Sequence, residues 1–115
     1  MSVSPVLPLI VSQEIAERSI SLFLKIPGDL YYLEGHFPGF PIVAGVVQLH
    51  WAVTFAQHFF DLPKAVRDVS KMKFSNLMRP DDSVCLTLIL DDDKQLVSYR
   101  FDCEDKNYAT GCFSY

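Results

Sequence analysis

The chain has 115 residues, a formal net charge of −4 and a hydrophobic fraction of 50%. This length predicts one domain, and this composition excludes a disordered or collagen-like chain. An acidic domain is a poor general binder of nucleic acid, and no apolar run approaches the roughly 18 residues that a membrane-spanning helix requires. Because the apolar fraction is high for a small monomer, we expect either a dense core or apolar surface that a second chain covers.

Cysteine usage and the N-terminal sequence predict a cytoplasmic protein. The cysteines lie in stretches typical of strands and lack metal-ligand spacing, which indicates buried reduced thiols at Cys85, Cys103 and Cys112. The residues before position 11 have no positive charge ahead of their apolar residues and include two prolines. This pattern is not typical of a signal peptide.

The elements expected along the chain are one early helix and several strands. Alternating apolar residues predict a half-buried strand over 15–26, which a turn over 27–29 ends. A loop rich in aromatic residues, glycine and proline follows over 30–44, and a helix is predicted over 45–60, where neither Gly nor Pro occurs after the first residue. Strands separated by charged turns are then predicted over 66–76, 83–91, 95–103 and 107–114. This order indicates an α+β fold with an antiparallel sheet.

The predicted helix is apolar around most of its circumference, which is typical of a buried helix. Four of its polar residues, His50, Thr54, Gln57 and His58, fall within an arc of roughly 100° at the helical period. Such a stripe is either the solvated side of the helix or the lining of a pocket or subunit interface, and helix geometry leaves both interpretations open.

The loop before the helix presents one histidine, His36, from a backbone restrained by proline and glycine. The first N–H groups of the helix, at Gly45, Val46 and Val47, have no intrahelical acceptor, and the helix dipole there favours negative charge. A thioester carbonyl placed at this helix start would be stabilised as its enolate forms, while His36 removes the α-proton. A lone histidine is more often structural, but this setting favours the catalytic interpretation.

A longer motif surrounds this histidine. It reads Gly35-His36-Phe37-Pro38-Gly39-x-Pro41-Ile42-x-x-Gly45-Val46. It resembles the signature of the 3-hydroxyacyl-[acyl carrier protein] dehydratases of type II fatty-acid synthesis. The segment 72–82 is similar to the strand and turn that follow in that family, and the order of helix and strands agrees over nearly the whole chain. The short length and the change at position 50 make the chain most similar to the small dehydratase-like proteins of aryl polyene biosynthesis clusters.

The resemblance implies a single hotdog domain over 1–115, in which a curved antiparallel sheet wraps around one long central helix. It implies the dehydration of 3-hydroxyacyl thioesters to trans-2-enoyl thioesters, in fatty-acid or aryl polyene synthesis, without a metal or cofactor. Proteins of this family usually dimerise through their sheets. We therefore expect a homodimer, with a heterodimer of two dehydratase-like chains as the alternative.

The resemblance also implies roles for single residues. His36 matches the base that removes the α-hydrogen, the backbone carbonyl near Ile42 matches the group that orients this histidine, and Gly45 and Val46 match the helix start that polarises the thioester. Fourteen residues after the histidine the family has a Glu or Asp, reached from the partner subunit, and this sequence has His50 instead. His50 is the acid itself, or a heterodimer partner supplies the carboxylate, or His50 only packs.

The substrate class implies acyl carrier protein, which has an acidic docking helix, as a partner. Five of the ten Lys and Arg residues lie within 64–79, and we expect Lys71, Lys73 and Arg79 to contact the carrier protein. Evenly solvated strand charges are the alternative interpretation of this segment.

Three aromatic residues near the loop are candidates for the acyl tunnel or for plain core: Tyr32, Phe37 and Phe40. Two other functions stay open. One is a non-catalytic subunit that binds acyl groups or stabilises a heterodimer. The other is a hotdog thioesterase, which normally needs an Asp or Glu on the helix, and 45–60 contains neither.

Overall fold

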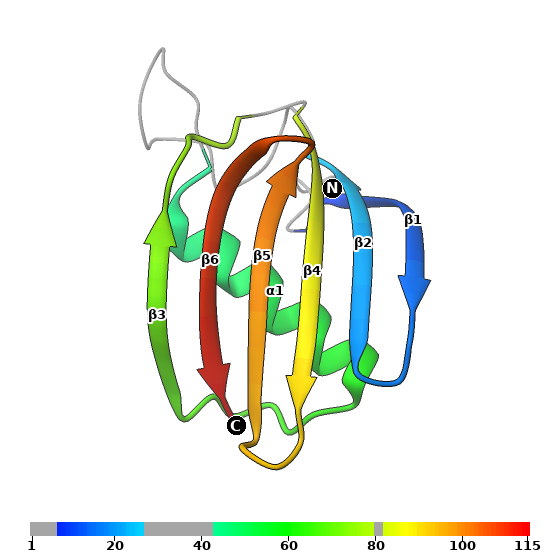
Figure 1. Ribbon diagram of the computed structural model, residues 1–115, viewed down its shortest axis with the longest axis vertical. Coiled ribbons are helices and arrows are strands. Elements are labelled where there is room, and N and C mark those ends of the chain that lie inside the picture. Colours follow the sequence, from blue (N-terminus) through cyan, green and yellow to red (C-terminus); the bar gives the residue numbers. More distant parts are fainter. Residues whose placement is uncertain (1–6, 27–42, 80–81) are drawn as a thin grey trace, which may run out of the picture.

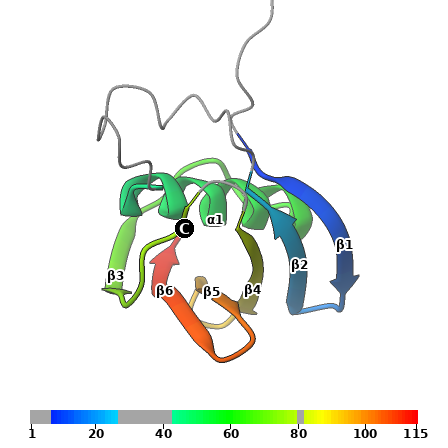
Figure 2. The same ribbon diagram turned by 90° about the horizontal axis from the view of Figure 1, so that it is seen from above.

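The computed structural model describes residues 7–26, 43–79 and 82–115. In these ranges one helix lies across the open side of a curved antiparallel sheet (Figures 1 and 2). The elements are β1 (Leu9–Ile15), β2 (Ser19–Lys25), α1 (Gly45–Phe60), β3 (Asp68–Phe74), β4 (Ser83–Asp91), β5 (Leu96–Cys103) and β6 (Lys106–Ser114). The expected α+β hotdog architecture is confirmed.

The strand order in the sheet is β1-β2-β4-β5-β6-β3, with every neighbouring pair antiparallel. The strands β1 and β3 are therefore the two edges. The helix α1 begins beside β3 and crosses the sheet toward β2, and the chain after the helix returns to form β3 (Figure 1). The N-terminus of α1 consequently lies next to an unpaired strand edge.

Most predicted boundaries agree with the structure. The helix and β4 have the predicted bounds, and the other three late strands agree within two residues at each end. The prediction of one strand over 15–26 is wrong, because two strands, β1 and β2, meet at a turn over 16–18. Nearly every residue of β1 is exposed, so no alternation of apolar and polar residues marks this edge strand.

The core fills the layer between α1 and the concave face of the sheet. Alternate residues of β2, β4 and β5 point into it, and Trp51 packs there from the helix with no exposed surface. Burial of one large apolar side chain contributes about 1.5–3 kcal/mol, so this layer is the main source of stability. The three cysteines are free thiols in strands, as predicted, but they are half-buried rather than buried. No helix in the described ranges is both long and apolar enough to cross a membrane.

Large hydrophobic side chains remain exposed in two regions of the described chain and at Ile89 on β4. One lies on β1 and β2 and contains Leu9, Val11, Ile15 and Phe23. The other, which we call the β3 edge surface, contains Val46, Val66, Val69, Met72, Phe74 and Leu77. The core therefore takes up only part of the apolar excess that the composition shows.

Candidate functional site

Two backbone N–H groups at the start of α1 have no acceptor among the described residues. The N-cap residue, Ala44, has an extended backbone and no side chain that could cap the helix. Its carbonyl accepts hydrogen bonds from the N–H groups of Val47 and Gln48, at 3.0 and 3.2 Å. The N–H groups of Gly45 and Val46 therefore have no acceptor among the described residues, and the helix dipole makes this position favourable for a partial negative charge. The prediction that the N–H of Val47 is also unpaired is wrong, because this group donates to Ala44.

The strand β3 lies directly against this helix start. A Cβ atom on Gly45 would stand 2.6 Å from the ring of Phe74, which is closer than any real contact. Glycine at this position therefore allows the aromatic ring to cover the first helical residue. Phe74 is still 49% exposed, so one side of its ring faces outward at the strand edge.

A buried glutamine holds the backbone before the helix. The N–H of Val43 donates to the Met78 carbonyl at 2.7 Å, and the carbonyl of Val43 accepts from Nε2 of Gln48 at 3.1 Å. Gln48 is 3% exposed and is the one polar residue of the described core. The sequence analysis missed Gln48, although it shares a helix face with Ala52 and Phe55, which would have placed it among buried residues.

His50 lies on the exposed side of α1. Its expected counterpart His36 lies outside the described residues. The same holds for Ile42 and for the tunnel candidates Tyr32, Phe37 and Phe40. The roles of these residues stay predictions.

A second feature lies farther along the same helix. Thr54 and His58 follow His50 at intervals of four residues, which places the three side chains on one side of α1. Thr54 and His58 line a cavity of about 490 Å³ between the helix and β1, and His50 lies one turn before Thr54. Its lining is mostly apolar and consists of Leu7, Ile10, Gln13, Thr54, Phe55, His58 and Phe59. We call this the helix–β1 cavity.

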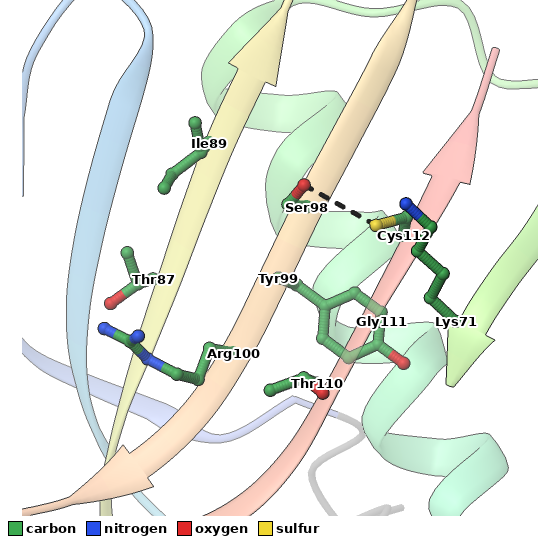
Figure 3. A pocket seen from close by; sticks show the side chains of 9 residues that line it. All are labelled: Lys71, Thr87, Ile89, Ser98, Tyr99, Arg100, Thr110, Gly111 and Cys112. Atoms are coloured by element: carbon green, nitrogen blue, oxygen red, sulfur yellow. Dashed lines mark hydrogen bonds between the residues drawn. The ribbon is translucent and has the colours of Figure 1, made fainter. Parts of the chain in front are cut away.

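The predicted docking cations do not share one surface pocket. Lys71 sits in a bulge of β3, with φ 56°, and lines a pocket of about 320 Å³ on the sheet face opposite to α1. Figure 3 shows Lys71 and Arg100 on opposite sides of this pocket, with Ser98 and Thr110 between them. Arg79 lines another, polar pocket near the start of β4 and donates its N–H to Asp82 at 2.9 Å.

The described residues contain no group of three or more His, Cys, Asp or Glu side chains that could hold a metal ion. The charged pairs that the structure gives are exposed, at Arg18–Asp92 and Arg100–Asp102. Exposed pairs of this kind contribute little to stability.

Comparison with known proteins places this geometry in a family. One chain of the dehydratase heterocomplex ApeI:P from Xenorhabdus doucetiae is 25% identical, with a TM-score of 0.87 over 93% of this chain and 96% of that chain. An uncharacterized protein from Erwinia carotovora subsp. atroseptica shares the fold at 23% identity, with a TM-score of 0.80 over 93% and 94%. No curated protein matches the sequence. The family model for the ApeI dehydratase matches residues 12–112, and the chain therefore belongs to the ApeI-like dehydratase family.

Proposed function

We propose that this dehydratase converts (3R)-3-hydroxyacyl thioesters, carried on acyl carrier protein, into trans-2-enoyl thioesters and water. Family membership supports the dehydratase role. The observation that carries the specific reaction is that the N–H groups of Gly45 and Val46, at the start of α1, have no acceptor among the residues that the structure describes. Elimination of a 3-hydroxyl group requires an acidic α-hydrogen, and polarising the thioester carbonyl is what makes that hydrogen acidic.

In the proposed reaction His36 takes the α-proton, and the electrons of the broken C–H bond form the double bond between C2 and C3. The bond from C3 to the hydroxyl oxygen breaks, and the hydroxide takes up a proton to leave as water. The N–H groups of Gly45 and Val46 stabilise the negative charge that develops on the thioester oxygen. Losing one such donor typically costs about 10²–10³ in rate, and a positioned acid or base contributes about 10²–10⁴.

The proton for the leaving hydroxide comes from His50 or from a carboxylate of a second chain. An imidazole can carry this proton near neutral pH, which supports His50. A second chain is supported by the β3 edge surface, because an unpaired strand edge with exposed apolar side chains is a template for pairing. The similar ApeI:P structure is a dehydratase heterocomplex, which favours a heterodimer over a homodimer for this protein.

The helix–β1 cavity is a suitable place for the far end of the acyl chain. Its volume of about 490 Å³ lies in the range of small-molecule sites, which are mostly apolar with a few polar groups. The side of α1 that begins at His50 leads to it, over eight residues or about 12 Å of helix. Lys71, Lys73 and Arg79 remain the proposed contacts for acyl carrier protein, although Lys71 and Arg79 line different pockets.

The reaction is tested with purified protein and a 3-hydroxyacyl group on acyl carrier protein, with enoyl product measured by mass spectrometry. We expect loss of one water from the acyl group and no release of free carrier thiol. Free thiol without enoyl product would indicate a thioesterase and overturn the proposal.

A second candidate function is a non-catalytic subunit that binds acyl groups or stabilises a heterodimer. The presence of His50 where the family has a carboxylate favours it. The same assay is therefore run with this chain alone, with a candidate dehydratase partner alone, and with both together. If the mixture forms product at the rate of the partner alone, the non-catalytic function is supported. If the mixture is faster than the partner alone and His36→Ala removes this gain, catalysis by this chain is supported.

A further inference from the structure

We propose that Gln48 is a positioning residue, which holds the first turn of α1 so that the N–H groups of Gly45 and Val46 face a bound thioester oxygen. This inference rests on the proposed function, because it assigns a cause to the geometry on which that function depends. It concerns described residues only, and it adds a side chain to which the family motif gives no role.

The residue that Gln48 holds is Val43, two positions before the helix. Both backbone groups of Val43 are bonded: its N–H to the carbonyl of Met78 at 2.7 Å, and its carbonyl to Nε2 of Gln48 at 3.1 Å. Val43, Gln48 and Met78 are all buried. The start of α1 is thus tied on one side to the segment after β3, and on the other side to its own first turn.

The orientation of the Gln48 amide is determined by its partner. A carbonyl oxygen only accepts hydrogen bonds, so the NH₂ group of Gln48 must face Val43 and the amide oxygen must point elsewhere. That oxygen, Oε1, is buried and has no hydrogen-bond partner within 7–26, 43–79 and 82–115. Leaving a buried acceptor unpaired typically costs about 1–3 kcal/mol, which an apolar side chain of similar length would avoid. Packing therefore does not explain glutamine at this position, whereas the hydrogen bond to Val43 does.

The absence of a side-chain cap on Ala44 points to the same role. A helix usually begins with Ser, Thr, Asp or Asn, whose side-chain oxygen bonds to the free N–H groups of the first turn. Such a cap would compete with a substrate for those donors. Ala44 leaves the donors open. Gln48 instead stabilises the turn through a carbonyl that lies before the helix, and so occupies none of them.

The first test separates an effect on the position of the helix start from an effect on the stability of the fold. Gln48→Met removes the hydrogen bond and the unpaired oxygen while keeping the length of the side chain. We expect its melting temperature to equal or exceed that of the wild type, because the buried acceptor is gone. We also expect kcat for 3-hydroxyacyl carrier protein to fall at least about tenfold, since the donors lose alignment, with KM changed less than about threefold. Gln57→Met makes the same chemical change on the same helix and serves as the control.

The second test needs no catalysis. Amide hydrogen exchange is measured at Val43 and Val47, whose N–H groups donate to Met78 and Ala44. Exchange at both should be at least about tenfold faster in Gln48→Met than in Gln57→Met, because local opening is no longer opposed by the Gln48 bond. Unchanged exchange would overturn the positioning role whether or not the protein is active.

The outcomes distinguish this inference from the proposed function. Faster exchange with wild-type kcat in Gln48→Met would overturn the inference and leave the proposed function intact. A parallel loss of melting temperature and activity would show an ordinary structural residue, and would also overturn it. If the wild type forms no enoyl product with any partner, the proposed function fails, and the exchange result alone decides whether Gln48 positions the helix start.

Discussion

The contact between Gly45 and Phe74 predicts that the effect of Gly45→Ala on the stability of the fold depends on the Phe74 ring. In Gly45→Ala the new Cβ would lie 2.6 Å from Cζ and 2.7 Å from Cε1 of the ring. Ordinary carbon contacts are about 3.5–4.0 Å, so the ring must retreat by about 1 Å. Overpacking costs about 1–3 kcal/mol, and we expect the low end because the Phe74 ring is 49% exposed and can swing outward.

A second effect opposes this cost. Alanine is a better helix residue than glycine by up to about 1 kcal/mol, and less at the first position of a helix. We therefore expect Gly45→Ala to destabilise the wild type by less than about 1 kcal/mol, but to be neutral or stabilising in a Phe74→Ala background. The coupling free energy between the two positions should be about 1 kcal/mol.

Urea unfolding of the four proteins in this cycle measures that coupling. Thermal unfolding gives an independent value, since about 1 kcal/mol corresponds to a melting-temperature shift of about 4 °C for a domain of this size. The reasoning is refuted if Gly45→Ala has the same effect with and without the Phe74 ring. In that case the close approach of β3 to the helix start would not be the reason for glycine at this position.

Two further predictions concern the buried tyrosine of β5 and the strand edge. Burial raises the pKa of the Tyr99 hydroxyl, whose oxygen has no hydrogen-bond partner. The wild type should therefore lose stability as the pH rises above about 10, where the phenol of the unfolded chain ionises. Tyr99→Phe should be at least as stable as the wild type at neutral pH and should lose less free energy of unfolding at alkaline pH. Chemical denaturation of both proteins at neutral and at alkaline pH measures these differences. Val69→Glu together with Met72→Glu should weaken association in sedimentation experiments by at least about tenfold. The control is Ile89→Glu, at a more exposed position away from the β3 edge, and it should not weaken association; equal effects would argue against pairing along β3.

The helix could be predicted with its bounds because local signals mark both ends. Gly45 follows a segment rich in proline, and Asp61 ends the helix in a left-handed conformation with φ 55°. The charged turns between the late strands are local signals of the same kind. The edge strand β1 carries no such signal, since strand pairing alone determines it.

The candidate site was only partly predictable, because some of its features follow from local signals and others depend on contacts between distant parts of the chain. The free N–H groups of Gly45 and Val46 follow from the helix boundary, which the sequence indicates. The ring of Phe74 and the hydrogen bond from Gln48 depend on how the helix lies on the sheet, and no local pattern encodes that placement. The bulge at Lys71 likewise turns this side chain toward a pocket on the far face of the sheet, away from the surface of Arg79.

The most direct test of the central claim is the rate of enoyl formation by His36→Ala relative to the wild type. Both are assayed with the same 3-hydroxyacyl carrier protein and the same partner chain, after circular dichroism has shown equal folding. The proposed mechanism predicts a loss of about 10²–10⁴ in kcat, which is the contribution of a positioned base. Equal rates for the two proteins would contradict the catalytic role of this chain.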